Sequence, residues 1–136
     1  MRAGIPIEYS ISASRISLSA ALLILGLGLA GCSSEQEVSY QSDIQPIVER
    51  HCAECHTQGG PGFAKSGFLV DSYQHIMRGT KYGPVIVPGS SISSTLYRLV
   101  AGETDPSIRM PHGRAPLPER EVELIAAWID QGAKNN

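Results

Sequence analysis

The chain has 136 residues, a net charge of −2 at pH 7 and 18% charged residues. This length suits one small domain, and no basic patch with interleaved aromatic residues points to nucleic acid as a partner. Only two Phe and one Trp are present, so the apolar core is thin for a domain of this size. Such a domain is marginally stable unless a bound ligand adds apolar mass to its core.

The N-terminus has the pattern of an export signal. Basic residues precede an apolar stretch over residues 16–30, which is too short to cross a bilayer comfortably but suits a signal peptide. The stretch ends in LAGC, which resembles the bacterial lipoprotein cleavage box, in which the cysteine becomes the lipidated first residue. An ordinary signal peptide with an incidental Cys32 is the alternative. We expect a lipoprotein signal peptide at 1–31, lipidated Cys32 and a tether at 32–39, and the folded domain at 40–136.

Helices are predicted where apolar residues recur three and four positions apart. The first begins at Asp43 as its N-cap and runs into the cysteine motif at 52–56. Its inward stripe consists of Ile44, Ile47, Val48 and His51. The glycine-rich segment 57–67 that follows is predicted to be a loop.

Two short helices are predicted in the middle of the chain. One spans 71–79, with either Asp71 or Ser72 as N-cap, and a loop interrupted by prolines follows it at 81–90. The other spans 91–102 and ends at a glycine. Its inward residues are expected to be Ile92, Leu96, Leu99 and Val100.

The last predicted helix, over residues 118–132, has the strongest amphipathic pattern of the chain. Acidic residues crowd its first turn and Gly132 ends it. Its inward face is formed by Val122, Ile125, Ala126 and Ile129, with Trp128 beside them. No segment shows sustained two-residue alternation, so the predicted fold class is all-α, with about four helices.

The motif Cys52-Ala53-Glu54-Cys55-His56 has four candidate uses. A structural zinc site needs four N or S ligands, and no second pair with suitable spacing exists. A thioredoxin-like dithiol needs a βαβ context that this chain lacks, and a plain disulfide leaves the histidine without a role. Covalent haem attachment explains all three residues. The two thiols, about one helical turn apart, meet two vinyl groups as thioethers, and His56 presents an imidazole nitrogen to the iron.

Several motifs together resemble a class I mono-haem c-type cytochrome domain of the small bacterial kind. They are HCAECH after a short helix, VPG before a helix with LYRLV, RMP in a late loop and ELIAAWIDQGA in the last helix. The resemblance covers about residues 40–134. It implies a small cytochrome c-like fold wrapped around one covalent haem c, with the first and last helices crossing beside the haem and Trp128 near the crossing.

The resemblance also implies a sixth ligand to the iron. The family places a methionine in the loop before the last helix, which here is Met110, and a Met/His pair raises the potential relative to a bis-His pair. His112, on the same loop, is the rival ligand. Met77 is expected to be a core residue, while His51 and His75 are expected to be surface or packing residues.

Further expectations concern the surroundings of the haem. A backbone carbonyl of the 59–62 loop is a candidate acceptor for the second ring nitrogen of His56, although a simple tight turn explains that loop equally well. The candidates to approach the propionates are Tyr82, Tyr97, Arg98, Arg109 and Arg114.

These features predict a membrane-tethered electron carrier facing the periplasm of a bacterium, with redox proteins as its partners. Ser33, rather than an aspartate, follows the lipidated cysteine, which favours the outer membrane over the inner one. No nucleophile–base pair or paired-carboxylate site is evident, so the chain itself is not expected to be an enzyme. A haem-based sensor or ligand-binding module, or a docking subunit of a larger redox complex, is the alternative.

Overall fold

The computed structural model of the chain describes residues 36–136. The predicted signal peptide at 1–31 and the predicted lipidation of Cys32 lie outside the described residues. Each helix in the described part of the chain is too short or too polar to cross a bilayer.

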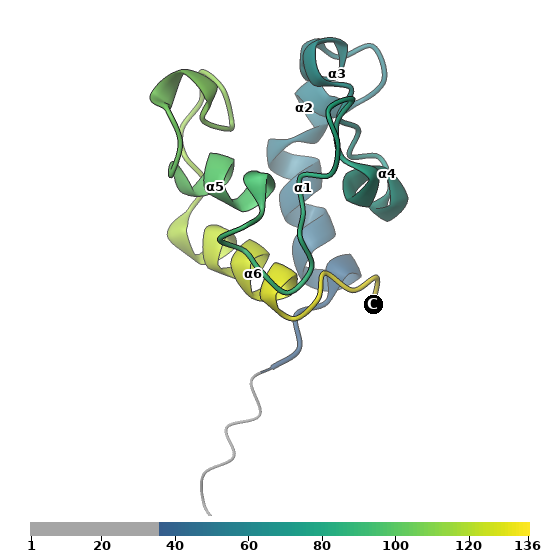
Figure 1. The fold of residues 1–136 in the computed structure, drawn as a ribbon, viewed down its shortest axis with the longest axis vertical. Coiled ribbons are helices and arrows are strands. Elements are labelled where there is room, and N and C mark those ends of the chain that lie inside the picture. Colours follow the sequence, from purple (N-terminus) through teal and green to yellow (C-terminus); the bar gives the residue numbers. More distant parts are fainter. Residues whose placement is uncertain (1–35) are drawn as a thin grey trace, which may run out of the picture. The chain divides into compact units, whose positions relative to one another are not determined.

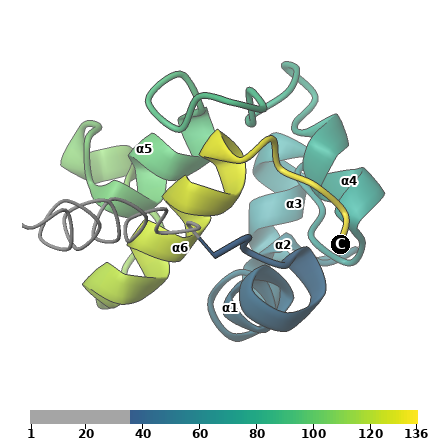
Figure 2. The same ribbon diagram turned by 90° about the horizontal axis from the view of Figure 1, so that it is seen from below.

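The described residues are helical and contain no β-strand, apart from an isolated bridge between Thr80 and Gly83. This confirms the predicted all-α class, but the described residues form six α-helices instead of about four. In chain order the elements are η2 (Tyr40–Ile44), α1 (Gln45–His51), α2 (Ala53–His56), α3 (Pro61–Ser66), α4 (Tyr73–Arg78), α5 (Thr95–Ala101), η3 (Pro106–Ile108) and α6 (Glu119–Asp130). Figure 1 shows α5 and α6 on one side of the domain and α1 to α4 on the other, and Figure 2 shows the same division from below.

The first helical segment begins earlier than predicted. Ser39, not Asp43, is the N-cap of η2, because its Oγ accepts a hydrogen bond from the Ser42 N–H at 3.2 Å. Asp43 instead reaches back and accepts from the Ser39 N–H at 2.8 Å. The two side chains together satisfy two backbone donors at once, in a reciprocal arrangement similar to a capping box but one residue longer. The reciprocal arrangement extends the helical start to Tyr40.

Helix α3 lies inside the segment that was predicted to be a loop. Pro61 opens the helix, where its missing N–H and its restricted φ are both compatible with the first turn. Gly67 closes it in the left-handed conformation with a φ of +71°, and its N–H donates to the Phe63 carbonyl. The glycines that surround α3 are therefore its borders, and the prediction of a continuous loop at 57–67 is wrong.

The two central helices follow the prediction to different degrees. Ser72 caps α4 and Gly79 ends it, as expected. Helix α5, however, begins only at Thr95, and Ile92 is 76% exposed instead of inward. The reason is the buried Ser94, whose Oγ accepts from the Val87 N–H at 2.8 Å and donates to the Ser90 carbonyl at 2.8 Å. These bonds hold the preceding residues in a tight turn and delay the helix.

The core lies where α6 meets the first helical segment. Trp128 is 1% exposed, and its ring centroid lies 5.7 Å from that of Tyr40 and 6.5 Å from that of Tyr73. Its indole N–H donates to the Lys134 carbonyl at 2.9 Å, so the one polar atom of this buried ring is satisfied. Trp128 therefore joins the start of the first helical segment to the last helix.

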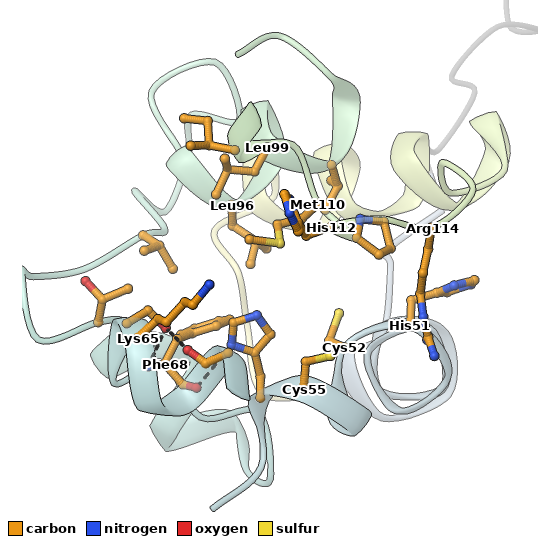
Figure 3. A pocket seen from close by; sticks show the side chains of 18 of the residues that line it. His51, Cys52, Cys55, Lys65, Phe68, Leu96, Leu99, Met110, His112 and Arg114 are labelled. Carbon is orange, nitrogen blue, oxygen red and sulfur yellow. Dashed lines mark hydrogen bonds between the residues drawn. The ribbon is translucent and has the colours of Figure 1, made fainter. Parts of the chain in front are cut away.

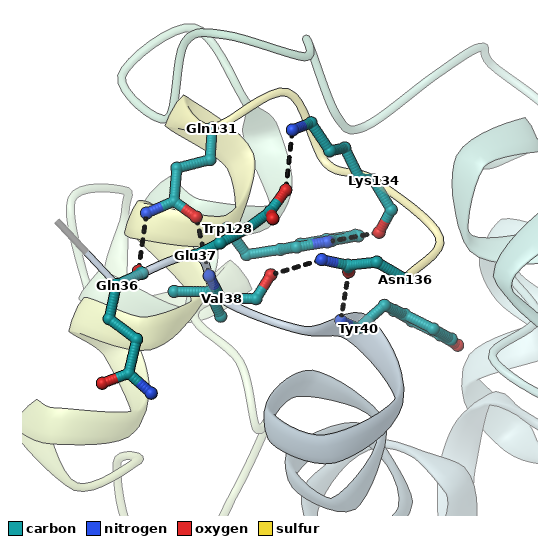
Figure 4. Close-up of polar contacts among 8 residues, drawn as sticks. All are labelled: Gln36, Glu37, Val38, Tyr40, Trp128, Gln131, Lys134 and Asn136. Atoms are coloured by element: carbon teal, nitrogen blue, oxygen red, sulfur yellow. Dashed lines mark hydrogen bonds and ion pairs between the residues drawn. The ribbon is translucent and has the colours of Figure 1, made fainter. Parts of the chain in front are cut away.

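The two ends of the described chain are fastened to each other (Figure 4). The Val38 N–H donates to Gln131 Oε1 at 2.7 Å, and the Tyr40 N–H donates to Asn136 Oδ1 at 2.8 Å. Asn136 in turn donates through Nδ2 to the Val38 carbonyl at 3.3 Å. Val38 is buried, so the last residues of the predicted tether lie against the folded domain.

Candidate haem site

A cavity of about 470 Å³ lies between the two groups of helices. Its size falls within the range of roughly 300–1,000 Å³ that is typical of cofactor sites. Figure 3 shows Cys52, Cys55 and Phe68 on one side of it and Leu96, Leu99, Met110 and His112 on the other. The wall is mainly apolar, with side chains that include Phe68, Val85, Leu96, Leu99, Val100 and Leu117. An apolar wall with a few polar groups suits a large, flat, mainly apolar cofactor.

The cysteine motif lies at the break between α1 and α2. The Cys52 N–H donates to the Val48 carbonyl at 2.9 Å, and the His56 N–H donates to the Cys52 carbonyl at 3.0 Å. These bonds keep the chain helical through the motif, so that Cys52, Cys55 and His56 all line the cavity. The arrangement agrees with the predicted run of the first helical segment into the motif.

Both motif cysteines are free thiols. Burial, with a smaller contribution from the neighbouring Cys55, raises the pKa of the Cys52 thiol to about 11. A thiol with this pKa is neutral at pH 7, whereas redox dithiols and zinc sites depend on a stabilised thiolate. Within residues 36–136, no group of three or more His, Cys, Asp or Glu side chains is arranged to hold a metal ion. The site therefore does not favour the zinc or dithiol alternatives.

The imidazole of His56 is oriented by the backbone of Phe68. His56 Nδ1 lies 3.3 Å from the Phe68 carbonyl oxygen, so the acceptor is not the candidate carbonyl of the 59–62 loop. With Nδ1 protonated and donating, Nε2 keeps its lone pair for a metal ion. Desolvation lowers the pKa of His56, and the bond to Phe68 offsets part of this effect. The ring is therefore neutral at pH 7, which is the form that binds iron.

Gly62, in the first turn of α3, leaves room for this imidazole. A Cβ added at Gly62 would lie 2.8 Å from the Cys55 carbonyl oxygen and 2.8 Å from Cε1 of His56. Only a residue without a side chain fits at this distance. Gly62 therefore lies against the motif, and α3 packs directly next to it.

On the opposite side, two of the predicted ligand candidates line the cavity. Met110 is partly buried, and its N–H donates to the Leu99 carbonyl at 3.1 Å. His112 also lines the cavity but is exposed. Met77 packs against the core and is not part of the wall, as expected.

The other two histidines are paired with carboxylates. His51 lines the cavity, and its Nε2 lies 2.7 Å from Glu121 Oε2 in a geometry unsuited to a hydrogen bond. His75 lies away from the cavity and pairs with Asp71 on the surface.

Among the five propionate candidates, the structure brings one to the cavity. Arg114 lines its edge and forms an ion pair with Glu54. Tyr82 is 83% exposed and does not line the wall, and neither do Tyr97, Arg98 and Arg109. Sequence reasoning missed Lys65, a polar residue of the wall, because the helix that carries it was not predicted.

The fold and the site together define a class of protein: a small all-α domain whose C-x-x-C-H motif faces an apolar cavity opposite a methionine loop is a c-type cytochrome domain. Residues 52–112 match a family described as Planctomycete cytochrome C, and the chain thus contains a cytochrome c-type domain. Comparison with curated proteins and with solved structures gave no match.

A cytochrome c-type domain implies covalently bound haem, and the described residues fit this group. The cavity has the necessary apolar wall, both motif cysteines are free, and the ring of His56 is oriented by the Phe68 carbonyl. Haem bound there also supplies the apolar mass that the core of this small chain lacks.

Proposed function

We propose that the chain is a mono-haem electron carrier, tethered to a bacterial membrane by a lipid on Cys32. One haem c is attached through Cys52 and Cys55, and His56 and Met110 are the two axial ligands of its iron. The observation that carries the proposal is the cavity, because the motif lines one side of it and Met110 lines the other.

Each residue of the site has a definite task in this proposal. Cys52 and Cys55 would each hold the haem through one thioether, which addition of S–H to a vinyl group would form without loss of an atom. His56 binds through Nε2 while its Nδ1–H donates to Phe68. Haem bound in this way supplies a one-electron couple between ferric and ferrous iron.

The proposal excludes catalysis by the chain itself. If His56 and Met110 both bind the iron, the metal keeps no free position for a substrate, and little rearrangement accompanies electron transfer. Redox proteins that donate and accept the electron are then the partners, and the protein connects them at the periplasmic face of the membrane. A lipid anchor on Cys32 in the outer membrane completes this assignment.

The test is the absorption spectrum of the full chain, matured in a host with a haem-ligation system. The ferric wild type should show a methionine–iron charge-transfer band. Met110→Ala should abolish the band, whereas His112→Ala should keep it. Met77→Ala is the matched control because this methionine is partly buried but does not line the cavity.

Two outcomes would replace the proposal. Loss of the band in His112→Ala, but not in Met110→Ala, would assign the distal ligand to the histidine. Rapid carbon monoxide binding by the reduced wild type would show an open iron position and favour a haem-based sensor. Fractionation tests the tether separately, because Cys32→Ala should release the protein from the membrane without changing its spectrum.

A further inference from the structure

The loop that carries Met110 is held to the domain mainly at its two ends. We define the Met110 loop as residues 109–118. At its start, the Met110 N–H donates to the Leu99 carbonyl at 3.1 Å, and near its end Leu117 is buried. Between these anchors, residues 111–116 make no backbone–backbone hydrogen bond to the rest of the described domain. The middle of the loop depends on its side chains.

One side chain of this middle section crosses to the other side of the cavity. Arg114 forms an ion pair with Glu54, which lies between the two motif cysteines. The partners are 60 positions apart in the chain. Figure 3 shows Arg114 at the edge of the pocket. The pair therefore joins the loop of the distal ligand to the segment that holds the proximal one.

The neighbouring basic residues of this region have no such partner. Arg109, at the start of the Met110 loop, and Arg120, in the first turn of α6, pair with no carboxylate among residues 36–136. Of the three arginines at 109, 114 and 120, only Arg114 pairs with a carboxylate of the haem-attachment motif.

We infer that Arg114 and Glu54 form a latch that positions the Met110 loop and limits the release of its ligand from the iron. The inference rests on the proposed function, since it requires a ligand on this loop. Arg114 is a positioning residue in this scheme, because it acts through the loop and not on the iron. Both partners are partly exposed, with side-chain exposures of 44% and 69%, so the latch is weak and sensitive to salt.

Imidazole titration of the ferric full-length holoprotein measures the latch, because imidazole competes with the loop ligand for the iron. At low ionic strength, Arg114→Gln should bind imidazole about two- to five-fold more tightly than the wild type, as expected for the loss of an exposed ion pair. Glu54→Gln should give the same shift, and the double variant should shift no further than either single one. In about 1 M salt the difference from the wild type should vanish, because the Debye length falls to about 3 Å.

The control variant is Arg120→Gln, which removes the same charge next to the loop without breaking an ion pair. Its imidazole affinity should equal that of the wild type. The charge-swapped double variant Glu54→Arg/Arg114→Glu keeps an ion pair and should have the imidazole affinity of the wild type. It still tests the latch if a single variant folds poorly.

Three results would overturn the latch. They are an unchanged affinity in Arg114→Gln at low salt, a shift that persists in 1 M salt, or an equal shift in Arg120→Gln. A wild type without the methionine–iron band whose reduced form binds carbon monoxide rapidly would have no ligand from this loop and would refute the proposed ligation and the latch together. A wild type with the band and an unresponsive Arg114→Gln would refute the latch alone.

Discussion

The Nδ1 atom of His56 lies 3.3 Å from the carbonyl oxygen of Phe68, the residue that follows the last glycine of the α3 segment. This contact orients the imidazole ring. Gly62 lies so close to the ring that a Cβ at this position would be 2.8 Å from Cε1 of His56. The orientation of the His56 imidazole thus depends on the position of α3, which follows the motif in the chain.

Substitution of Gly62 should disturb the position of the His56 ring. In Gly62→Ala the new Cβ would lie 2.8 Å from the Cys55 carbonyl oxygen and 2.9 Å from Nε2 of His56. We expect a stability loss of about 1–3 kcal/mol from overpacking, together with a changed ferric spectrum. Denaturant unfolding and absorption spectroscopy measure the two effects.

Gly59→Ala is the control for this prediction. Gly59 has a φ of +85°, and a Cβ there would contact nothing within 4 Å. Alanine should therefore cost about 1–2 kcal/mol of backbone strain and leave the spectrum unchanged. If Gly59→Ala alters the spectrum as much as Gly62→Ala does, close approach to the imidazole is not the cause.

The two motif cysteines should each contribute one covalent bond to the haem. The matured wild type should exceed the mass of its polypeptide and lipid by one haem, because addition of a thiol to a vinyl group loses no atom. Cys52→Ala and Cys55→Ala should each retain a single thioether, and the double variant should lose all haem on denaturation. Intact mass spectrometry and a haem stain on a denaturing gel measure this.

Cys32 provides the matched comparison for the cysteine prediction. Cys32→Ala should keep the full haem mass and lose only the lipid. Haem that survives denaturation in the Cys52→Ala/Cys55→Ala double variant would contradict attachment at this motif.

Two isoleucines should differ sharply in their contribution to stability. Ile129 is 0% exposed in α6, whereas Ile92 lies on the surface turn before α5. Ile129→Val should lower the free energy of unfolding by about 0.5–1.5 kcal/mol, because one buried methylene is lost. Ile92→Val should change it by less than about 0.5 kcal/mol. Equal losses in urea unfolding would contradict the exposed placement of Ile92.

Tyr40 should make stability fall at alkaline pH. Its pKa is raised above the ordinary value of 10.0 by burial first, and then by the charges of Glu49 and Tyr73. Because the folded-state pKa is the higher one, the folded protein holds the phenol proton more tightly than the unfolded chain. The resulting stabilisation is complete below pH 10 and is lost as the pH rises through the folded-state pKa.

Tyr40→Phe removes this titration, since the ring remains and the ionisable hydroxyl does not. The variant should match the wild type near pH 7 and show a shallower decline in unfolding free energy above pH 10. Parallel declines in the two proteins, measured by denaturant unfolding at each pH, would contradict the role of Tyr40.

Some features of this protein were predictable because they depend on neighbours in the chain. The spacing of Cys52, Cys55 and His56 places three functional groups on about one helical turn, and this is enough to predict haem attachment. The pattern of Ile125, Trp128 and Ile129 defines the buried face of α6 for a similar reason, since residues three and four apart share one side of a helix. The all-α class followed from such local patterns.

Other features were decided only by the tertiary structure. Ser94 delays α5 and exposes Ile92 through bonds to a preceding turn. Phe68, rather than the 59–62 loop, orients His56, and Arg114 meets Glu54 from 60 positions away. Contacts of this kind form between segments that packing brings together. The residues around a side chain in the sequence do not indicate a partner so far away in the chain. The sequence by itself determined the chemistry of attachment, and the packing of the two groups of helices determined which residues orient the histidine and surround the cavity.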